Sequence, residues 1–325
     1  MPGTKIAIDA GHGSQTKGKR TPPFTKSVDI DHDGKIDIPK GSRYQEHYAN
    51  VGVADRLYKS LKKRGYEVIK VGWNDENAAD DADISLAQRQ SKIKKASCDY
   101  SISIHFNAYG DGDRFNSVAG TSIYIHAQYP EDSRRLAEYI LSEIKKGSDQ
   151  QNRGIHSAKL ALCNCKSMKT KASVLCELAF MTNSKEAQNY MANQDFWEES
   201  ANEIANAVDH YCNCKNYEER SSKGIQKLYH TVVEGDTLYQ LANDNHTTTE
   251  ELIRLNKLKA PDHLTIGQKL LLMRYRIHVI KQGDSLTKLS KSYLGDASRY
   301  QEIMRLNQLS TDDVEVGQII KVPVD

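Results

Sequence analysis

The C-terminal part of the chain repeats itself, and this repeat restricts the fold more than any other feature of the sequence. The stretch "LYHTVVEGDTLYQLA" around Gly235 returns as "RIHVIKQGDSLTKLS" around Gly283, and "ELIRLNKL" returns as "EIMRLNQL". A closing "LTIGQKLLL" is likewise answered by "VEVGQIIKV". Such self-similarity indicates two copies of one structural unit. Each copy predicts a strand, a Gly-Asp turn, a helix capped by Thr237 or Ser285, a second helix and a closing strand.

The two copies resemble LysM domains, small β-α-α-β modules that bind N-acetylglucosamine chains of peptidoglycan or chitin. The resemblance implies a sugar groove in each copy, between the Gly-Asp turn and the loop before the closing strand. Its implied residues are Gly235, Asp236, Thr237, Leu238 and Ile266, then Gly283, Asp284, Ser285, Leu286 and Val316. Two modules in tandem raise avidity, so we expect a polymer anchor. The alternative interpretation is a simple turn followed by a helix cap.

Residues 1–213 alternate between strand-like and helix-like segments. The strand-like runs are "KIAIDAG", "YEVIKVG", "YSISIHFN", "GTSIYIHA" and "SVLCELAF". Helical periodicity is found at about 49–61, 84–96, 133–144 and 196–211. This order predicts an α/β domain with a mainly parallel sheet covered by helices on both faces. The polar stretch 214–227 predicts a linker, followed by one module at 228–273 and another at 274–325.

Composition excludes several classes of protein. The formal net charge is only +2, from 45 basic and 43 acidic side chains, so we expect no nucleic-acid partner. We expect no membrane insertion, because no apolar run approaches about 18 residues. The first residues lack the apolar segment of a secretory signal. We therefore expect the protein to be made in the cytoplasm. We also expect it to be a monomer. Six cysteines in a long chain favour reduced thiols, although two "CNC" tripeptides leave a disulfide or metal role open.

Three side chains in the first part of the chain have the chemistry of metal ligands. His12 follows the first predicted strand and His105 ends the third. The carboxyl ends of parallel strands meet at one edge of a sheet, which is also where ligands bind. We therefore expect both histidines to lie at that edge. Glu46 lies on the apolar stripe of the following helix, where a carboxylate needs a partner or a metal. Two histidines and a carboxylate form the ligand set of a catalytic zinc site. His47 competes with Glu46 but faces away from the stripe.

Amide cleavage at such a site also needs a group that moves protons. Glu177 closes the strand "SVLCELAF" shortly after apolar Val174 and Leu175, and we expect it at the same edge of the sheet. A carboxylate there can take a proton from water and deliver it to a leaving nitrogen. The alternative interpretation is a salt-bridged glutamate.

Four motifs together resemble the zinc-dependent N-acetylmuramoyl-L-alanine amidases of the amidase type 3 group. They are, in order, "IDAGHG", "QEHYAN", "SIHFNA" and "CELAFMTN". The resemblance implies that His12, Glu46 and His105 bind Zn²⁺ and that Glu177 is the catalytic acid and base. Arg89 matches an arginine common in that group, and we interpret Arg89 and Asn107 as residues that support the site rather than take part in the reaction. The reaction implied is cleavage of the amide between the lactyl group of N-acetylmuramic acid and the L-alanine of the stem peptide.

The segment between the first two motifs departs from the group. Its spacing matches the opening of a calcium loop, with Gly34 at position six and acids at positions one, three, five and nine, namely Asp29, Asp31, Asp33 and Asp37. Position twelve is Lys40, where a bidentate glutamate belongs. A Ca²⁺ site is therefore one interpretation, and a turn-rich loop on the substrate side is the one that the residues favour.

We conclude from the sequence that this chain is a peptidoglycan amidase held on the wall by two LysM modules. Without an export signal of its own, it is expected to act at the bacterial wall after release by a holin or by lysis, as an endolysin or autolysin does. One alternative is a zinc peptidase or carboxypeptidase that acts on stem peptides, since the same metal chemistry cleaves other amides. Another is an inactive wall-binding protein, against which the four intact site residues argue.

Overall fold

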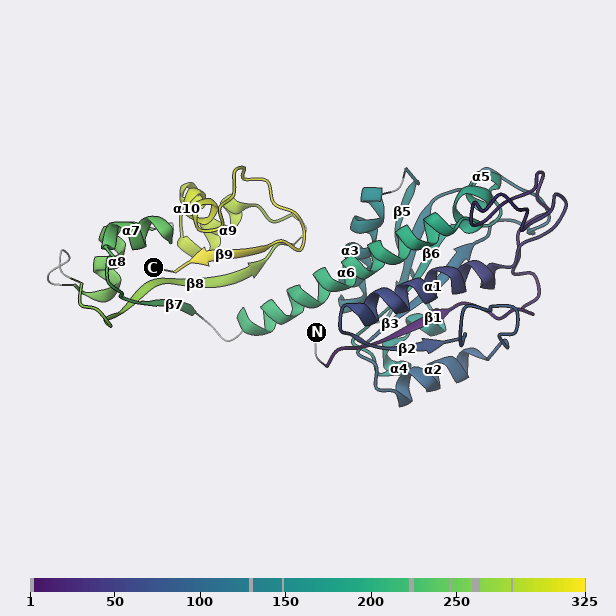
Figure 1. The fold of residues 1–325 in the computed structure, drawn as a ribbon, viewed down its shortest axis with the longest axis horizontal. Helices are drawn as coiled ribbons and strands as arrows, with labels where there is room; N and C mark the ends of the chain where they lie inside the picture. Colours follow the sequence, from purple (N-terminus) through teal and green to yellow (C-terminus); the bar gives the residue numbers. More distant parts are fainter. Residues whose placement is uncertain are drawn as a thin grey trace. The chain divides into compact units, whose positions relative to one another are not determined.

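The computed structural model describes residues 3–128, 131–147, 149–221, 225–245, 247–258, 264–281 and 283–324. The chain divides into two compact units, Met1–Asp209 and His210–Asp325. Each unit has its own sheet (Figure 1).

The first unit is built on a six-stranded sheet with the order β2-β1-β3-β6-β4-β5. All strand pairs in it are parallel except β4 with β6, so the sheet is mainly parallel, as predicted. Its strands are β1 (Lys5–Ala10), β2 (Glu67–Val71), β3 (Tyr100–Asn107), β4 (Thr121–His126), β5 (Asn152–Ala158) and β6 (Ala172–Phe180).

Helices pack on both faces of this sheet (Figure 1). Side chains alternate along β1, so Ile6 and Ile8 point to one face while Ala7 packs on the other with Ile93. The main helices are α1 (Glu46–Lys63), α2 (Leu86–Lys95), α3 (Glu131–Gly147) and α6 (Gln194–Ser221). Short turns of helix complete the unit: η1 (Ala161–Cys163), α4 (Cys165–Met168), α5 (Ser184–Glu186) and η2 (Ala187–Met191).

The segment predicted as a linker, 214–227, is helical up to Ser221, and residues 222–224 of it lie outside the described part of the chain. Helix α6 continues to Ser221, and the next element, β7 (Gln226–Thr231), begins at Gln226. The apolar period ends near residue 212, but the following lysine, glutamates and arginine are good helix formers, so the helix propagates without it. The predicted domain boundaries themselves stay a prediction.

The second unit contains the two sequence repeats on one antiparallel sheet with the order β7-β8-β9. Strand β8 (Lys269–Val279) closes the first repeat and opens the second, so the predicted boundary at residue 273 lies inside one strand. The other elements are α7 (Leu238–Asp244), α8 (Thr249–Asn256), α9 (Leu286–Leu294), η3 (Ala297–Arg299), α10 (Tyr300–Leu306) and β9 (Ile319–Pro323).

Each repeat has a small core of its own. Leu238, Leu252 and Leu270 are buried in the first, and Leu286, Ile303 and Ile320 are buried in the second. No helix in the described part of the chain is long and apolar enough to cross a membrane.

Candidate metal centre

The loop after β1 brings His12 to the carboxyl edge of the sheet. The Gly11 N–H donates to the Ile104 carbonyl at 3.0 Å, which extends the pairing with β3 past the end of β1. A Cβ on Gly11 would overlap the ring of His105, so the loop can approach β3 this closely only with glycine there. His12 follows with a φ of 64°, a left-handed conformation that turns the chain away from the strand.

The structure brings together the three predicted ligands, His12, Glu46 and His105. One donor atom from each lies within 4.8 Å of the other two. Oε2 of Glu46 is 3.2 Å from Nε2 of His12, and its Oε1 is 3.1 Å from Nδ1 of His105. Ligands at tetrahedral angles and zinc bond lengths lie about 3.3 Å apart, so these separations fit a zinc ion.

Glu46 is the first residue of α1 and only 1% exposed. Its Oε1 accepts from the Phe106 N–H, whereas its buried Oε2 has no hydrogen-bond partner apart from the contact with His12. Burial alone would raise the pKa of Glu46, but the neighbouring His105 and His12 lower it below its usual range. A buried, ionised oxygen without a firm partner beside two imidazoles is the donor that a cation requires.

Glu177 lies beside this cluster because β6 pairs with β3. The backbone register sets Glu177 opposite His105, and paired residues on parallel strands point to the same face. Oε2 of Glu177 is buried without a hydrogen-bond partner. Burial raises the pKa of Glu177 to about 7; His105 opposes this shift and the negative charge of Glu46 adds to it. A carboxyl group of this kind can both accept and release a proton near neutral pH.

Arg89 contacts the backbone of the loop that carries His12. Its guanidinium is 2% exposed and donates to Oδ1 of Asp9 at 2.7 Å, to the Ala10 carbonyl at 2.6 Å and to the His12 carbonyl. Asn107 is different: its Oδ1 accepts from the Ala108 N–H at 2.8 Å, so the side chain terminates β3. The structure shows no bond from it to the four site residues.

Sequence reasoning missed a buried network behind His12. His47 lies with Nδ1 2.8 Å from the Gly11 carbonyl oxygen and Nε2 2.9 Å from Oδ2 of Asp81. Asn50 donates to the same Gly11 carbonyl at 3.0 Å. The signal was available, because His47 and Asn50 follow Glu46 on the first turn and a half of α1, but Asp81 lies in an irregular loop that no periodicity places.

The proposed calcium loop is partly assembled. Asp29, Asp31 and Asp37 place carboxylate oxygens within 4.8 Å of one another. Asp33 instead forms an ion pair with Lys35 at 2.7 Å. Asp29 and Asp37 accept from the N–H groups of Gly34 and Ile30, as turn residues do. Calcium binding stays a prediction.

The predicted sugar grooves are only partly as expected. Backbone hydrogen bonds from Val232 to Gln268 and from Gly267 to Val232 set the first Gly-Asp turn beside the loop that carries Ile266. Ile266 is 67% exposed and Val316 is 48% exposed, so both are available to a ligand. The side chains of Leu238 and Leu286 are not, because each is buried in its own core.

The turn residues of the two grooves have matching structural roles. The hydroxyls of Thr237 and Ser285 cap α7 and α9. Asp236 lies 2.6 Å from Nε2 of His230, and Asp284 lies 2.8 Å from Nε2 of His278. Gly235 and Gly283 adopt positive φ angles that favour glycine. These matched contacts strengthen the structural equivalence of the repeats, while the sugar contacts stay a prediction.

Several known proteins are similar to parts of this chain. A curated relative, the uncharacterized protein YqiI of Bacillus subtilis, is 27% identical over 65% of this chain and 86% of its own. The endolysin of Bacillus phage PZA is 29% identical over 33% of this chain and 43% of its own. Among solved structures, an N-acetylmuramoyl-L-alanine amidase from Clostridium difficile 630 has a TM-score of 0.49 at 24% identity, covering 65% of this chain and 97% of its own.

Family models match nearly the whole chain. The LysM domain model matches residues 230–272 and 278–323, which are the two repeats. The model of the N-acetylmuramoyl-L-alanine amidase family matches residues 6–210, which hold His12, Glu46, His105 and Glu177. The chain therefore belongs to the N-acetylmuramoyl-L-alanine amidase family and carries two LysM domains.

Proposed function

We propose that this peptidoglycan amidase is zinc-dependent, with His12, Glu46 and His105 as the metal ligands and Glu177 as the group that moves protons. The observation that carries the proposal is Oε2 of Glu46, which is buried without a firm hydrogen-bond partner 3.2 Å from Nε2 of His12. Burying an ionised oxygen costs free energy unless a cation or a hydrogen-bond donor contacts it.

The residues around the site divide the work of amide hydrolysis. When bound, zinc would polarise the scissile carbonyl and acidify a water molecule. Glu177 takes the proton from the attacking water and delivers it to the nitrogen of L-alanine, which leaves as an amine. Its pKa of about 7 suits both steps at neutral pH. Arg89 and His47 hold the backbone of the loop that carries His12.

The two LysM domains hold the enzyme on the wall that it cleaves. Each presents an exposed apolar side chain beside its Gly-Asp turn, Ile266 in the first and Val316 in the second. Binding of one module makes binding of the other intramolecular, so two weak contacts give a longer residence on the glycan.

The test is a digest of purified peptidoglycan followed by mass spectrometry of the soluble products. Zinc-loaded enzyme should release stem peptides that begin with a free L-alanine, and chelation should abolish the release until zinc is restored. Glu177→Gln should retain zinc and lower the rate by roughly 10² to 10⁴. The exposed Glu76→Gln is the matched control. Fragments cut within the peptide would indicate a peptidase, and wall binding without cleavage after zinc addition would contradict the proposal.

A further inference from the structure

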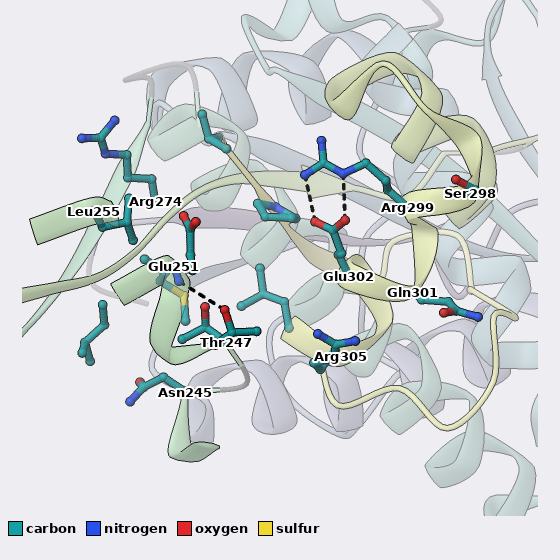
Figure 2. A pocket seen from close by; sticks show the side chains of 16 residues that line it. Asn245, Thr247, Glu251, Leu255, Arg274, Ser298, Arg299, Gln301, Glu302 and Arg305 are labelled. Atoms are coloured by element: carbon teal, nitrogen blue, oxygen red, sulfur yellow. Dashed lines mark hydrogen bonds and ion pairs between the residues drawn. The ribbon is translucent and has the colours of Figure 1, made fainter. Parts of the chain in front are cut away.

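A cavity of about 490 Å³ lies between the two LysM domains, where they share β8. Figure 2 shows Glu251 and Arg274 on one side of it and Arg299, Glu302 and Arg305 on the other. Its volume is that of pockets that hold a small ligand or part of a polymer. None of the residues predicted for the two sugar grooves lines it.

The two acidic side chains that line the cavity already have partners. Glu302 accepts from Arg299 through both carboxylate oxygens, at 2.7 and 2.9 Å. Glu251 accepts in the same way from Arg254, one turn away on α8, at 2.6 and 2.7 Å. These bidentate pairs neutralise both carboxylates. No acidic side chain in the lining is therefore left to neutralise another positively charged side chain.

Two lining arginines remain without such a partner. Within the part of the chain that the structure describes, neither Arg274 nor Arg305 forms a side-chain hydrogen bond or ion pair. Nε of Arg274 is buried and unsatisfied. A buried donor on a charged group lacks the compensation that water or an acceptor would supply. The cavity therefore presents two positive charges that an anionic ligand could neutralise.

The rest of the lining suits a sugar. Thr247 and Ser298 contribute hydroxyl groups, and Asn245 and Gln301 contribute amides that can both donate and accept. The buried Leu272 adds apolar surface. A hydroxyl-rich ring that carries a carboxylate matches this combination of groups better than a neutral N-acetylglucosamine chain does.

We propose that this cavity binds the carboxylate of muramic acid that amide hydrolysis exposes, an inference that rests on the proposed function. In that hydrolysis the bond between the lactyl carbonyl carbon and the alanine nitrogen breaks. Oxygen from water stays on the lactyl group as a carboxylate, and the nitrogen leaves as an ammonium group. The cavity distinguishes processed from unprocessed glycan, because only the processed strand carries the anion. It thereby holds the enzyme on strands that it has already cleaved.

The test is a calorimetric titration of the full chain with three prepared ligands. They are a peptide-free saccharide of alternating N-acetylglucosamine and N-acetylmuramic acid, an N-acetylglucosamine oligomer of equal length, and a free stem peptide. At low salt we expect the muramic acid saccharide to bind roughly tenfold more tightly than the neutral oligomer, and added salt to reduce the difference. The double variant Arg274→Gln and Arg305→Gln should lose this preference and keep its affinity for the neutral oligomer.

Lys291→Gln is the charge control, because this exposed lysine of α9 does not line the cavity. It should keep the preference, and thermal unfolding should show that all variants are folded. An unchanged preference in the double variant, or equal affinity of the natural chain for both saccharides, overturns the proposal. Arginine-dependent binding of the stem peptide alone overturns the assignment to muramic acid. Because the titration involves no cleavage, its failure leaves the amidase proposal intact, and an inactive amidase can still show the preference.

Discussion

Replacing His47 by alanine should destabilise the first unit and loosen the metal centre, although His47 is not a predicted ligand. The side chain is 1% exposed and lies between two acceptors, the Gly11 carbonyl and the Asp81 carboxylate. A neutral imidazole donates through only one ring nitrogen, so only one of these two contacts counts as a full hydrogen bond. The loss of a hydrogen bond to a charged group costs about 2 kcal/mol, so we expect the free energy of unfolding to fall by about 2 kcal/mol.

The assay is denaturant unfolding of the full chain followed by tryptophan fluorescence. The chain has two tryptophans, Trp73 and Trp197, and both are buried in the first unit, so the signal reports on that unit. Lys185→Ala is the control: its ion pair with Asp149 is exposed and 3.5 Å long, so its loss should leave the stability nearly unchanged.

Zinc affinity gives a second readout for His47→Ala. Because the Gly11 carbonyl loses one of its two side-chain contacts, we expect the His12 loop to loosen and zinc affinity to fall by roughly tenfold in a competition with a chelator. If His47→Ala unfolds at the same denaturant concentration as Lys185→Ala and binds zinc as tightly as the natural chain, the network does not support the site.

Three further predictions address other parts of the chain. Gly11→Ala should lower bound zinc measured by atomic absorption, because the added methyl group would meet the His105 ring; full zinc content would refute this. Burial would raise the pKa of Asp55, but hydrogen bonds from Lys70 and Lys59 lower it below its usual range. The ionised carboxylate therefore stabilises the fold above the usual pKa of an aspartate, and this contribution is lost as the pH falls through the lowered pKa. Asp55→Asn should accordingly flatten the acid side of the stability curve, and an unchanged acid limb would contradict this. Leu252→Ala should destabilise the second unit by about 2 to 5 kcal/mol in circular dichroism melts, since Leu252 is fully buried in its core; no loss of stability would refute that.

Much of the fold could be predicted because its signals are local. Alternating apolar residues in "KIAIDAG" and "YSISIHFN" identify two central strands without reference to the rest of the chain. Strand β5 was missed because it lies at the edge of the sheet, where all of its residues are exposed or only half-buried. The antiparallel pairing of β4 with β6 was also not visible, since strand direction depends on the path of the connections.

The sequence by itself predicted the four candidate site residues and determined the two repeats, because each is a short motif whose order along the chain is readable. Only the tertiary structure decided that β8 is one strand shared by both repeats, and that the side chains of Leu238 and Leu286 are buried in the cores of these repeats. It also decided the contacts of His47 with Asp81 and the cavity beside Arg274 and Arg305. These features join residues that are distant in sequence, so their energies depend on packing that no local pattern encodes.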